Sequence, residues 1–231
     1  MLNPFSGLYS VRSVYPPAIF RRRDMPNIQE VTHPLVQHHL VRLRDKSTPP
    51  AEFRALINRL ATVLAYEVTS DLELRPQDVT TPICKTTGHV LNQRIGIVPI
   101  LRAGLGMVDP VLHLIPNAEV WHLGLYRDEE TALPVEYYSK IPSTFPLDVG
   151  LILDPMLATG GSALAALKAL QDRGVKRMKL ASIIASQEGI DNVNKEFPDT
   201  QIYVCAIDPE LNSAKFIVPG LGDAGDRIFN T

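Results

Sequence analysis

The segment from Val149 to Gly174 restricts the possible folds of this 231-residue chain more than any other. A short apolar run ends in Asp154, and the loop that follows ends in residues 159–162, Thr-Gly-Gly-Ser. Small residues and leucines then continue with helical spacing until Gly174, a common helix-ending residue. A buried strand, a glycine-rich loop and a helix in immediate succession favour an α/β fold with a parallel sheet.

The rest of the chain extends this alternation. Apolar runs predict strands, and apolar residues at helical spacing predict helices. Strands are expected at 95–100, 120–125, 149–153, 179–185 and 202–207, and helices at 105–114, 162–173 and 191–197, after two helices that begin near Pro34 and Pro50. We therefore predict a parallel sheet flanked by helices on both faces.

Charge and composition argue against several classes of protein. The chain holds 23 basic and 25 acidic residues, whereas a dedicated nucleic-acid binder is usually basic. No stretch approaches the roughly 18 apolar residues of a membrane span, and the N-terminus lacks the apolar core of a signal peptide. Cys84 and Cys205 are too few for a disulfide framework or a zinc cluster, so both are expected to be buried apolar residues in a reducing cytoplasm.

The loop after Asp154 has the chemistry of an anion site. Gly160 and Gly161 let backbone N–H groups approach a phosphate, and the helix N-terminus adds free donors and the positive end of its dipole. Thr159 and Ser162 add hydroxyl donors, and Asp154 at the strand end could hold sugar hydroxyls. A tight turn capped by serine is the alternative. The loop has no lysine and is not a Walker loop, and no Gly-x-Gly-x-x-Gly follows a strand elsewhere.

This strand, acid, loop and helix resemble the phosphoribosyl-diphosphate (PRPP) loop of type I phosphoribosyltransferases. Many members of that group have two adjacent acids after the strand, and here Pro155 replaces the second acid. The version in residues 154–162 is similar to that of the uracil phosphoribosyltransferase family. The resemblance implies that the whole loop contacts PRPP, through Asp154, Pro155, Met156, Leu157, Ala158, Thr159, Gly160, Gly161 and Ser162.

Two further segments match the same family. Residues 98–107 place Arg102 directly after a strand, and the polar segment 126–140 is long for a turn and is typical of a lid or β-arm. The resemblance implies that Arg102 and Arg127 contact the diphosphate of PRPP, for which a guanidinium is a suitable partner. Without the family context, a solvated arginine at a strand end is an equally good interpretation of Arg102.

The C-terminal segment from Ile217 to Arg227 is rich in glycine, which lets the backbone approach a flat ligand. The resemblance implies that uracil is bound by backbone groups around Gly222, Asp223 and Ala224, together with Ile217, and that Asp223 also faces PRPP. Backbone N–H and carbonyl groups that match the polar edge of uracil would select it over cytosine, because the cytosine amino group would face a backbone N–H instead of an acceptor. Asp223 is the nearest candidate for a catalytic side chain, and no other general base is identified.

The resemblance covers residues 25–231, and its four motifs occur in order. It implies a type I phosphoribosyltransferase fold with a small hood and a flexible β-arm. The implied enzyme is a pentosyltransferase that converts uracil and PRPP to UMP and diphosphate in pyrimidine salvage. Catalysis would come from positioning and charge stabilisation, with Mg²⁺ carried mainly by PRPP. The family also implies a cytoplasmic homo-oligomer, a dimer or larger, and GTP activates some relatives; the sequence decides neither the assembly nor the effector.

Two other functions compete with this interpretation. The same fold can serve as an RNA-binding attenuator of pyrimidine operons, but the near-neutral charge argues against one. A purine-specific transferase is disfavoured by the uracil-type C-terminal loop.

Residues 1–24 form a separate N-terminal extension in this interpretation. Residues 1–23 hold four arginines and no acidic residue, and they show no periodicity. A flexible extension or a true start at Met25 is favoured over an organelle transit peptide and over an arm that docks on the body or on a neighbouring subunit.

Overall fold

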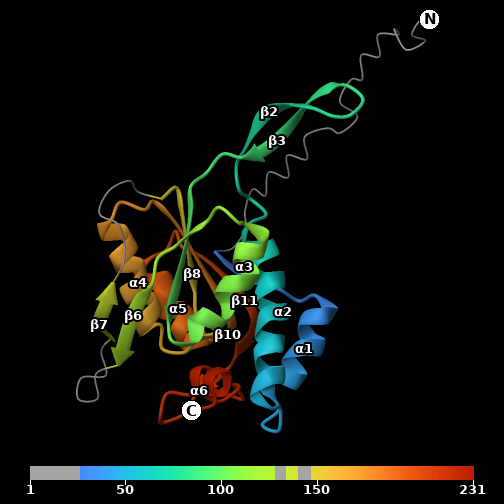
Figure 1. The fold of residues 1–231 in the computed structure, drawn as a ribbon. Coiled ribbons are helices and arrows are strands. Elements are labelled where there is room, and N and C mark those ends of the chain that lie inside the picture. The colour runs from blue at the N-terminus through green and yellow to red at the C-terminus, as the bar shows by residue number, and fades with distance from the viewer. Residues whose placement is uncertain (1–26, 128–133, 140–146) are drawn as a thin grey trace, which may run out of the picture.

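The computed structural model describes residues 27–127, 134–139 and 147–231, and Figure 1 shows its fold. A central sheet has the strand order β1-β11-β10-β8-β4-β6-β7, with β5 beside β4 and β9 beside β10. Its strands are β1 (Ile28–Glu30), β4 (Ile95–Leu101), β5 (Glu119–Val120), β6 (Leu123–Arg127), β7 (Pro134–Ser139), β8 (Val149–Leu153), β9 (Met156–Leu157), β10 (Arg177–Ser186) and β11 (Gln201–Asp208). Of these strands, only β7 pairs antiparallel to its neighbour.

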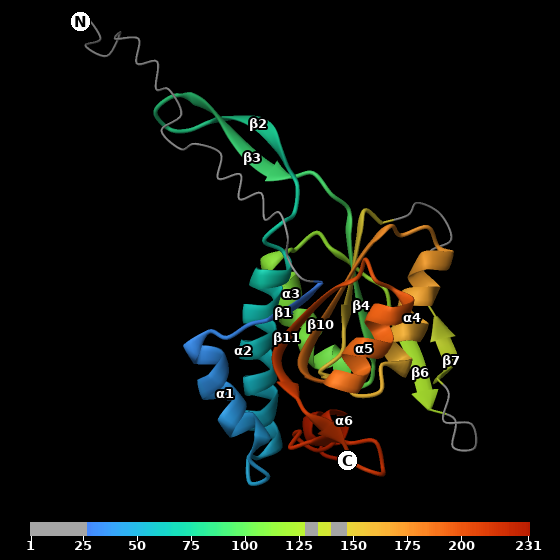
Figure 2. The same ribbon diagram turned by 180° about the vertical axis from the view of Figure 1, so that it is seen from behind.

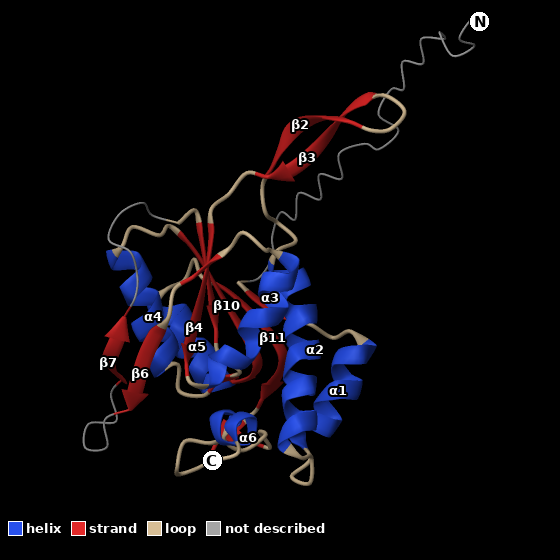
Figure 3. Ribbon diagram, in the orientation of Figure 1, coloured by secondary structure: helices blue, strands red, loops and turns tan. Residues whose placement is uncertain are grey.

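Helices cover both faces of this sheet, as the sequence predicted (Figures 2 and 3). One face packs against α2 (Pro50–Val68) and the other against α4 (Gly161–Asp172) and α5 (Gln187–Glu196). The remaining helical elements are α1 (Pro34–Arg44), the 3-10 helix η1 (Ala103–Met107), α3 (Val108–Leu114) and α6 (Ala224–Phe229). The predicted α/β fold class is therefore confirmed.

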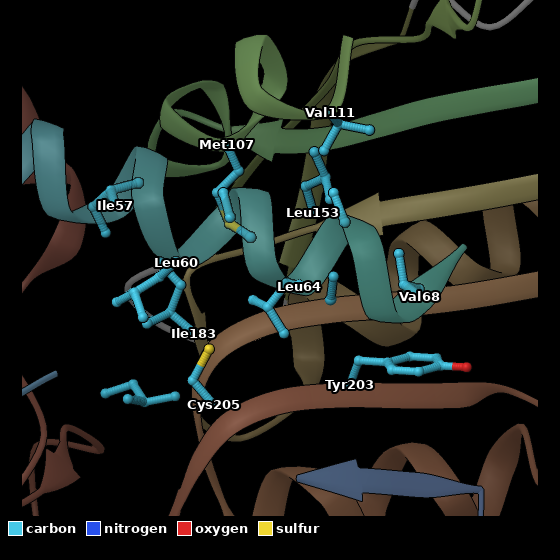
Figure 4. Packing of buried hydrophobic residues seen from close by; sticks show 14 of the residues in the cluster. Ile57, Leu60, Leu64, Val68, Met107, Val111, Leu153, Ile183, Tyr203 and Cys205 are labelled. Atoms are coloured by element: carbon cyan, nitrogen blue, oxygen red, sulfur yellow. The ribbon is translucent and has the colours of Figure 1, made fainter. Parts of the chain in front are cut away.

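The larger core lies between α2 and the sheet, as Figure 4 shows. Leucines of α2 repeat at helical spacing and are fully buried, so one stripe of the helix faces the strands. The labelled members of this core are Ile57, Leu60, Leu64, Val68, Met107, Val111, Leu153, Ile183, Tyr203 and Cys205. Burial raises the pKa of the Cys205 thiol to about 12, which keeps it protonated.

Three predicted elements differ in detail. The helix expected at 105–114 is divided into η1 and α3, and η1 begins close to the end of β8, where an added Cβ at Gly104 would be 2.6 Å from the Leu153 carbonyl oxygen. The strand expected at 120–125 divides into β5 and β6 around the buried Trp121. The helix expected at 191–197 begins at Gln187, because the Ser186 hydroxyl accepts a hydrogen bond from the Gly189 N–H at 2.9 Å and caps it.

A two-stranded hairpin of β2 (Leu74–Thr80) and β3 (Lys85–Leu91) was not predicted. It projects away from the sheet and helices (Figure 1), and most of its residues are exposed. Its strands have no buried face, so they lack the alternating pattern that marks a strand in a sequence. Cys84 lies beside its turn and is exposed, so the prediction of a buried Cys84 was wrong.

Strand β1 sets the point at which the folded body begins. It pairs in parallel with β11, and the Ile202 N–H donates to the Asn27 carbonyl oxygen at 2.6 Å. The expected extension, residues 1–24, lies outside the described residues. Among the described helices, none is both long and apolar enough to cross a lipid bilayer.

A chain that begins at Met25 should keep its thermal midpoint within about 2 °C of the full chain, because it retains β1. A chain that begins at Thr32 removes β1 and should melt several degrees lower. Thermal unfolding of the three chains measures both effects. An equal loss in the two shortened chains would show that residues 1–24 pack on the body or on a second subunit.

Candidate active site

The candidate site lies at the carboxyl edge of the parallel sheet. Strands β4, β8 and β11 run in the same direction, so their carboxyl ends meet at one edge. Helix α6 lies across that edge, with the C-terminus beside it (Figure 1). In α/β sheets this edge is where ligands bind.

The loop after β8 forms a small concave surface. A hollow of about 80 Å³ is lined by residue 154 and residues 156–163. Gly160 precedes α4 with a φ of +85°, a conformation that glycine adopts without strain, and α4 has no side-chain cap. The first N–H groups of α4 therefore remain available to a ligand, and the hollow suits a compact anion such as phosphate.

Helix α5 holds this loop from behind. The Ser186 hydroxyl donates to the Ala158 carbonyl oxygen at 2.6 Å, and Asn192 Nδ2 donates to the Thr159 carbonyl oxygen at 3.0 Å. Gly189 approaches so closely that an added Cβ would lie 2.2 Å from the Ala158 carbonyl oxygen. With these loop carbonyls bound to α5, the loop conformation is set before a ligand arrives.

Asp154 occupies the start of this loop and is unusual for an aspartate. The residue is partly buried, with some of its surface still exposed to solvent. Burial is the main cause that raises the pKa of its carboxyl to about 7; a hydrogen bond from the Met156 N–H opposes the rise, and the nearby Asp223 carboxylate adds to it. The effect of Asp223 on this pKa agrees with the geometry, in which the ends of β4 and β8 lie side by side and Arg102 after β4 pairs with Asp226 of α6.

Arg102 connects the end of β4 to helix α6. It follows β4, is exposed, and pairs with Asp226 of α6 at 2.9 Å between Nη2 and Oδ1. Its guanidinium also lies beside Gly225, where an added Cβ would be 3.6 Å from Nη2. The structure thus places a long, positively charged side chain between the sheet edge and the C-terminal loop.

The C-terminal loop follows β13 (Ile217–Val218), which pairs with β12 (Glu210–Leu211). Ile217 and Ala224 are buried, whereas Gly222 and Asp223 are exposed. Gly222 has a φ of +80°, and Asp223 caps α6 by accepting the Asp226 N–H at 2.9 Å. The loop therefore presents backbone at the sheet edge in a conformation that depends on glycine.

The remaining expected site residue, Arg127, ends β6, which pairs with β4. This places its backbone at the same sheet edge, while its side chain and residues 128–133 lie outside the described part. The segment expected to be a lid or β-arm, 126–140, is described only as the end of β6 and strand β7, which pair antiparallel.

Sequence reasoning did not identify Ser186, Gly189 or Asn192. Ser186 caps α5 and Gly189 lies in its first turn, whereas Asn192 lies in the middle of the helix, and none follows a recognisable site motif. A Ser followed three residues later by Gly signals a helix cap but says nothing of the loop that the cap supports. Two larger hollows, of about 390 Å³ on the β2–β3 hairpin and about 380 Å³ at the far ends of α4 and α5, contain none of the expected site residues.

Comparisons with known proteins agree on one family. The family model for uracil phosphoribosyltransferase matches residues 30–231. The uracil phosphoribosyltransferase of Roseiflexus sp. strain RS-1 is 53% identical over 207 residues, which are 90% of this chain and 100% of that protein. The enzyme of that name from Clostridium perfringens strain 13 is 51% identical over 208 residues, with the same coverage of 90% and 100%.

Solved structures show the same fold. The structure of an Aquifex aeolicus protein matches with a TM-score of 0.83 and 37% identity, over 87% of this chain and 97% of that one. Adenine phosphoribosyltransferase of Trypanosoma brucei matches with a TM-score of 0.54 at 10% identity, over 79% of this chain and 84% of that one. The second match shows that a phosphoribosyltransferase of very different sequence shares this fold.

The raised pKa of Asp154 predicts a pH-dependent change in stability. Between its ordinary value of 3.8 and about 7, the folded protein binds this proton more tightly than the unfolded chain. The free energy of unfolding should therefore fall as pH rises through that window. Asp154→Asn should melt like the native protein near pH 4 and at a higher temperature above about pH 7.

Thermal midpoints across that pH range measure this difference. Asp172→Asn is the control, because Asp172 is exposed and pairs with Lys168 on the same helix, so it should show no such trend. A constant difference between Asp154→Asn and the native protein at all pH values would contradict the buried-carboxyl account.

Gly189→Ala should displace the loop after β8, because its Cβ would overlap the Ala158 carbonyl oxygen. We expect a loss of about 1–3 kcal/mol in stability and weaker PRPP binding, measured by thermal unfolding and calorimetry. Gly88→Ala is the control, because the nearest atom to its Cβ would be 4.0 Å away. If Gly189→Ala binds PRPP with native affinity, α5 does not determine the conformation of the loop after β8.

Proposed function

Because the chain belongs to the uracil phosphoribosyltransferase family, whose members convert uracil and PRPP to UMP and diphosphate, we propose that this reaction takes place between the loop after β8 and the C-terminal loop. The observation that supports this most strongly is the 2.9 Å ion pair between Arg102, which follows β4, and Asp226 of α6, at the edge where β8 ends and the loop that begins with Asp154 emerges. A phosphoribosyl group bound by one loop would thus meet a base bound by the other.

PRPP is proposed to bind through residues 154–162. The amides at the start of α4, with Thr159 and Ser162, would hold its 5-phosphate, and Asp154 would hold the ribose hydroxyls. Hydroxyl donors favour the ionised form of a carboxylate, so PRPP binding should lower the pKa of Asp154 from its value of about 7. Arg102 and Arg127 would bind the diphosphate, and Arg102 must then share or leave Asp226.

Uracil is proposed to bind beside Ile217, with its polar edge on backbone groups of Gly222, Asp223 and Ala224. In the reaction the bond from uracil N1 to the anomeric carbon forms as the bond to diphosphate breaks, and N1 loses its proton. Arg102 and Arg127 would stabilise the charge of the departing diphosphate. Asp223 is the nearest proposed acceptor for the N1 proton.

Mg²⁺ is the proposed cofactor and would supply positive charge to the diphosphate. The described residues contain no cluster of three or more His, Cys, Asp and Glu side chains placed to hold a metal ion. Asp154 and Asp223 supply the oxygen donors that Mg²⁺ prefers, so they fit an ion that arrives on PRPP and keeps most of its water and phosphate ligands.

The direct test is UMP formation from labelled uracil and PRPP. Uracil should be the preferred base, and cytosine and hypoxanthine should be turned over far more slowly. Preference for a purine would overturn the base assignment, and RNA binding without turnover would favour the regulator.

We also propose a homo-oligomer in the cytoplasm and GTP as an effector, from the family alone. Sedimentation measures the assembly, and the same assay with and without GTP measures activation. A monomer, or unchanged kinetics with GTP, would contradict the corresponding proposal.

Arg102→Ala should lower kcat/KM for PRPP by the equivalent of about 1.5–3 kcal/mol, the value of a hydrogen bond to a charged group. Arg42→Ala is the control, since Arg42 is an exposed arginine of α1 paired with Glu52. Uracil binding measured without PRPP should change less. Native PRPP kinetics would contradict the diphosphate assignment.

Gly222→Val should abolish uracil turnover and leave PRPP binding largely intact. The φ of +80° is strained for valine, although the nearest atom to an added Cβ is 3.7 Å away, so the backbone and not crowding is what changes. UMP formation and PRPP calorimetry on the same folded variant measure both. Loss of both functions would contradict separate loops, and retention of both would place uracil elsewhere.

A further inference from the structure

We propose that Arg44 and Asp208 are positioning residues for uracil: they fix the C-terminal loop from behind and so set the affinity for uracil without touching it. This inference rests on the proposed assignment of that loop to the base. Neither residue belongs to a motif of the loop, and they are 164 positions apart in the sequence.

The two side chains form a close pair behind the loop. Arg44 ends α1 and Asp208 ends β11. The guanidinium donates from Nη1 to Oδ2 at 2.8 Å and from Nη2 to Oδ1 at 2.7 Å, a bidentate arrangement. Asp208 is only 4% exposed and the Arg44 side chain is 23% exposed, so the pair is largely buried and solvent screens it less than a surface pair.

Both members also bind one peptide unit of the loop, that of Gly220. Arg44 Nη1 donates to the Gly220 carbonyl oxygen at 2.8 Å, and the Gly220 N–H donates to Asp208 Oδ2 at 3.1 Å. Gly220 has a φ of +62°, and an added Cβ would lie 2.1 Å from the Ile217 carbonyl oxygen. The pair therefore fixes the tightest part of the turn, two residues before Gly222.

A second arginine holds the next carbonyl. Arg227 Nη1 donates to the Leu221 carbonyl oxygen at 2.8 Å and to that of Leu43 at 2.7 Å, and its guanidinium lies 4.2 Å from the centre of the Phe53 ring. The Gly220 carbonyl is thus bound by Arg44 of α1, and the Leu221 carbonyl by Arg227 of α6, which is itself anchored to the Leu43 carbonyl of α1. The residues that follow, 222–224, are those assigned to uracil.

Stability alone does not account for this arrangement. A buried ion pair recovers little more than its cost of desolvation, and apolar side chains of similar size often serve as well. What apolar side chains cannot do is fix the direction of a peptide N–H and carbonyl. Since the base is read by neighbouring backbone groups, a loop that tilts should lose uracil affinity first.

The test is steady-state kinetics of Arg44→Ala and Asp208→Asn. We expect the KM for uracil to rise about tenfold or more, because charged hydrogen bonds to the loop are lost, while the KM for PRPP changes less than about threefold. Arg44→Lys restores one donor and should recover part of the uracil KM. Arg42→Ala, on the same helix and also paired with a carboxylate, should leave both KM values unchanged.

A double variant separates positioning from folding. Arg44→Ala leaves the buried Asp208 without its cation and should lower the thermal midpoint. Arg44→Met with Asp208→Leu removes both charges, so the midpoint should recover while the uracil KM stays high. Asp71→Asn weakens a different partly buried cluster, with Lys179 and Arg177, and should lower the midpoint without the uracil effect.

If the double variant recovers the native uracil KM together with its thermal midpoint, the proposal is overturned. An equal rise in the KM values for uracil and PRPP in the single variants would overturn it as well. Gly222→Val distinguishes this failure from failure of the site itself. If Gly222→Val loses uracil turnover and the Arg44 and Asp208 variants do not, the loop binds uracil and the pair does not position it. If none of them affects uracil, the base assignment fails as well.

Discussion

The close approach of β4 to β8 determines where Arg102 and Asp154 emerge at the site. The two strands pair in parallel with Pro99 opposite Leu153, so the residues that follow them, Arg102 and Asp154, emerge at the same edge. The turn after β4 fits there only because Gly104 has no side chain to meet the Leu153 carbonyl oxygen. A larger residue at 104 would separate the strand ends, and with them the positive and negative groups of the site.

One group at that edge, the Asp154 carboxyl, lies where its ionised form is disfavoured. Asp154 is held where its charge is disfavoured, and the Asp223 carboxylate adds repulsion. A ligand with hydroxyl donors and an associated cation would favour the ionised carboxylate, so its binding should be coupled to loss of the Asp154 proton. The two loops are held by hydrogen bonds from outside the site, from Ser186 to the loop after β8 and from Arg44 to the C-terminal loop.

The sequence predicts those features whose residues are consecutive or close together in the chain. The apolar runs of β4, β8, β10 and β11 predict a parallel sheet because strands buried on both faces have no polar positions. The residues of 154–162 predict an anion loop because glycines, hydroxyls and a helix start are consecutive. The uracil phosphoribosyltransferase family was also identified from the residues, and the family match to 30–231 confirms it.

Other features depend on contacts between distant segments. Nothing near Arg44 distinguishes it from Arg42, although one is bound to a loop 176 positions away and the other is exposed. The β2–β3 hairpin escapes prediction because its exposed strands have no apolar face, and α5 supports the anion loop through residues that read only as a helix cap.

The central claim is that two loops at one sheet edge divide the substrate between them. A crystal structure of this protein with UMP tests it most directly, because the product spans both loops. The account predicts the phosphate on the backbone amides of residues 159–162, the ribose hydroxyls on Asp154, and the pyrimidine edge on backbone groups of residues 222–224. A pyrimidine bound away from residues 217–224, or a phosphate away from the start of α4, would contradict it.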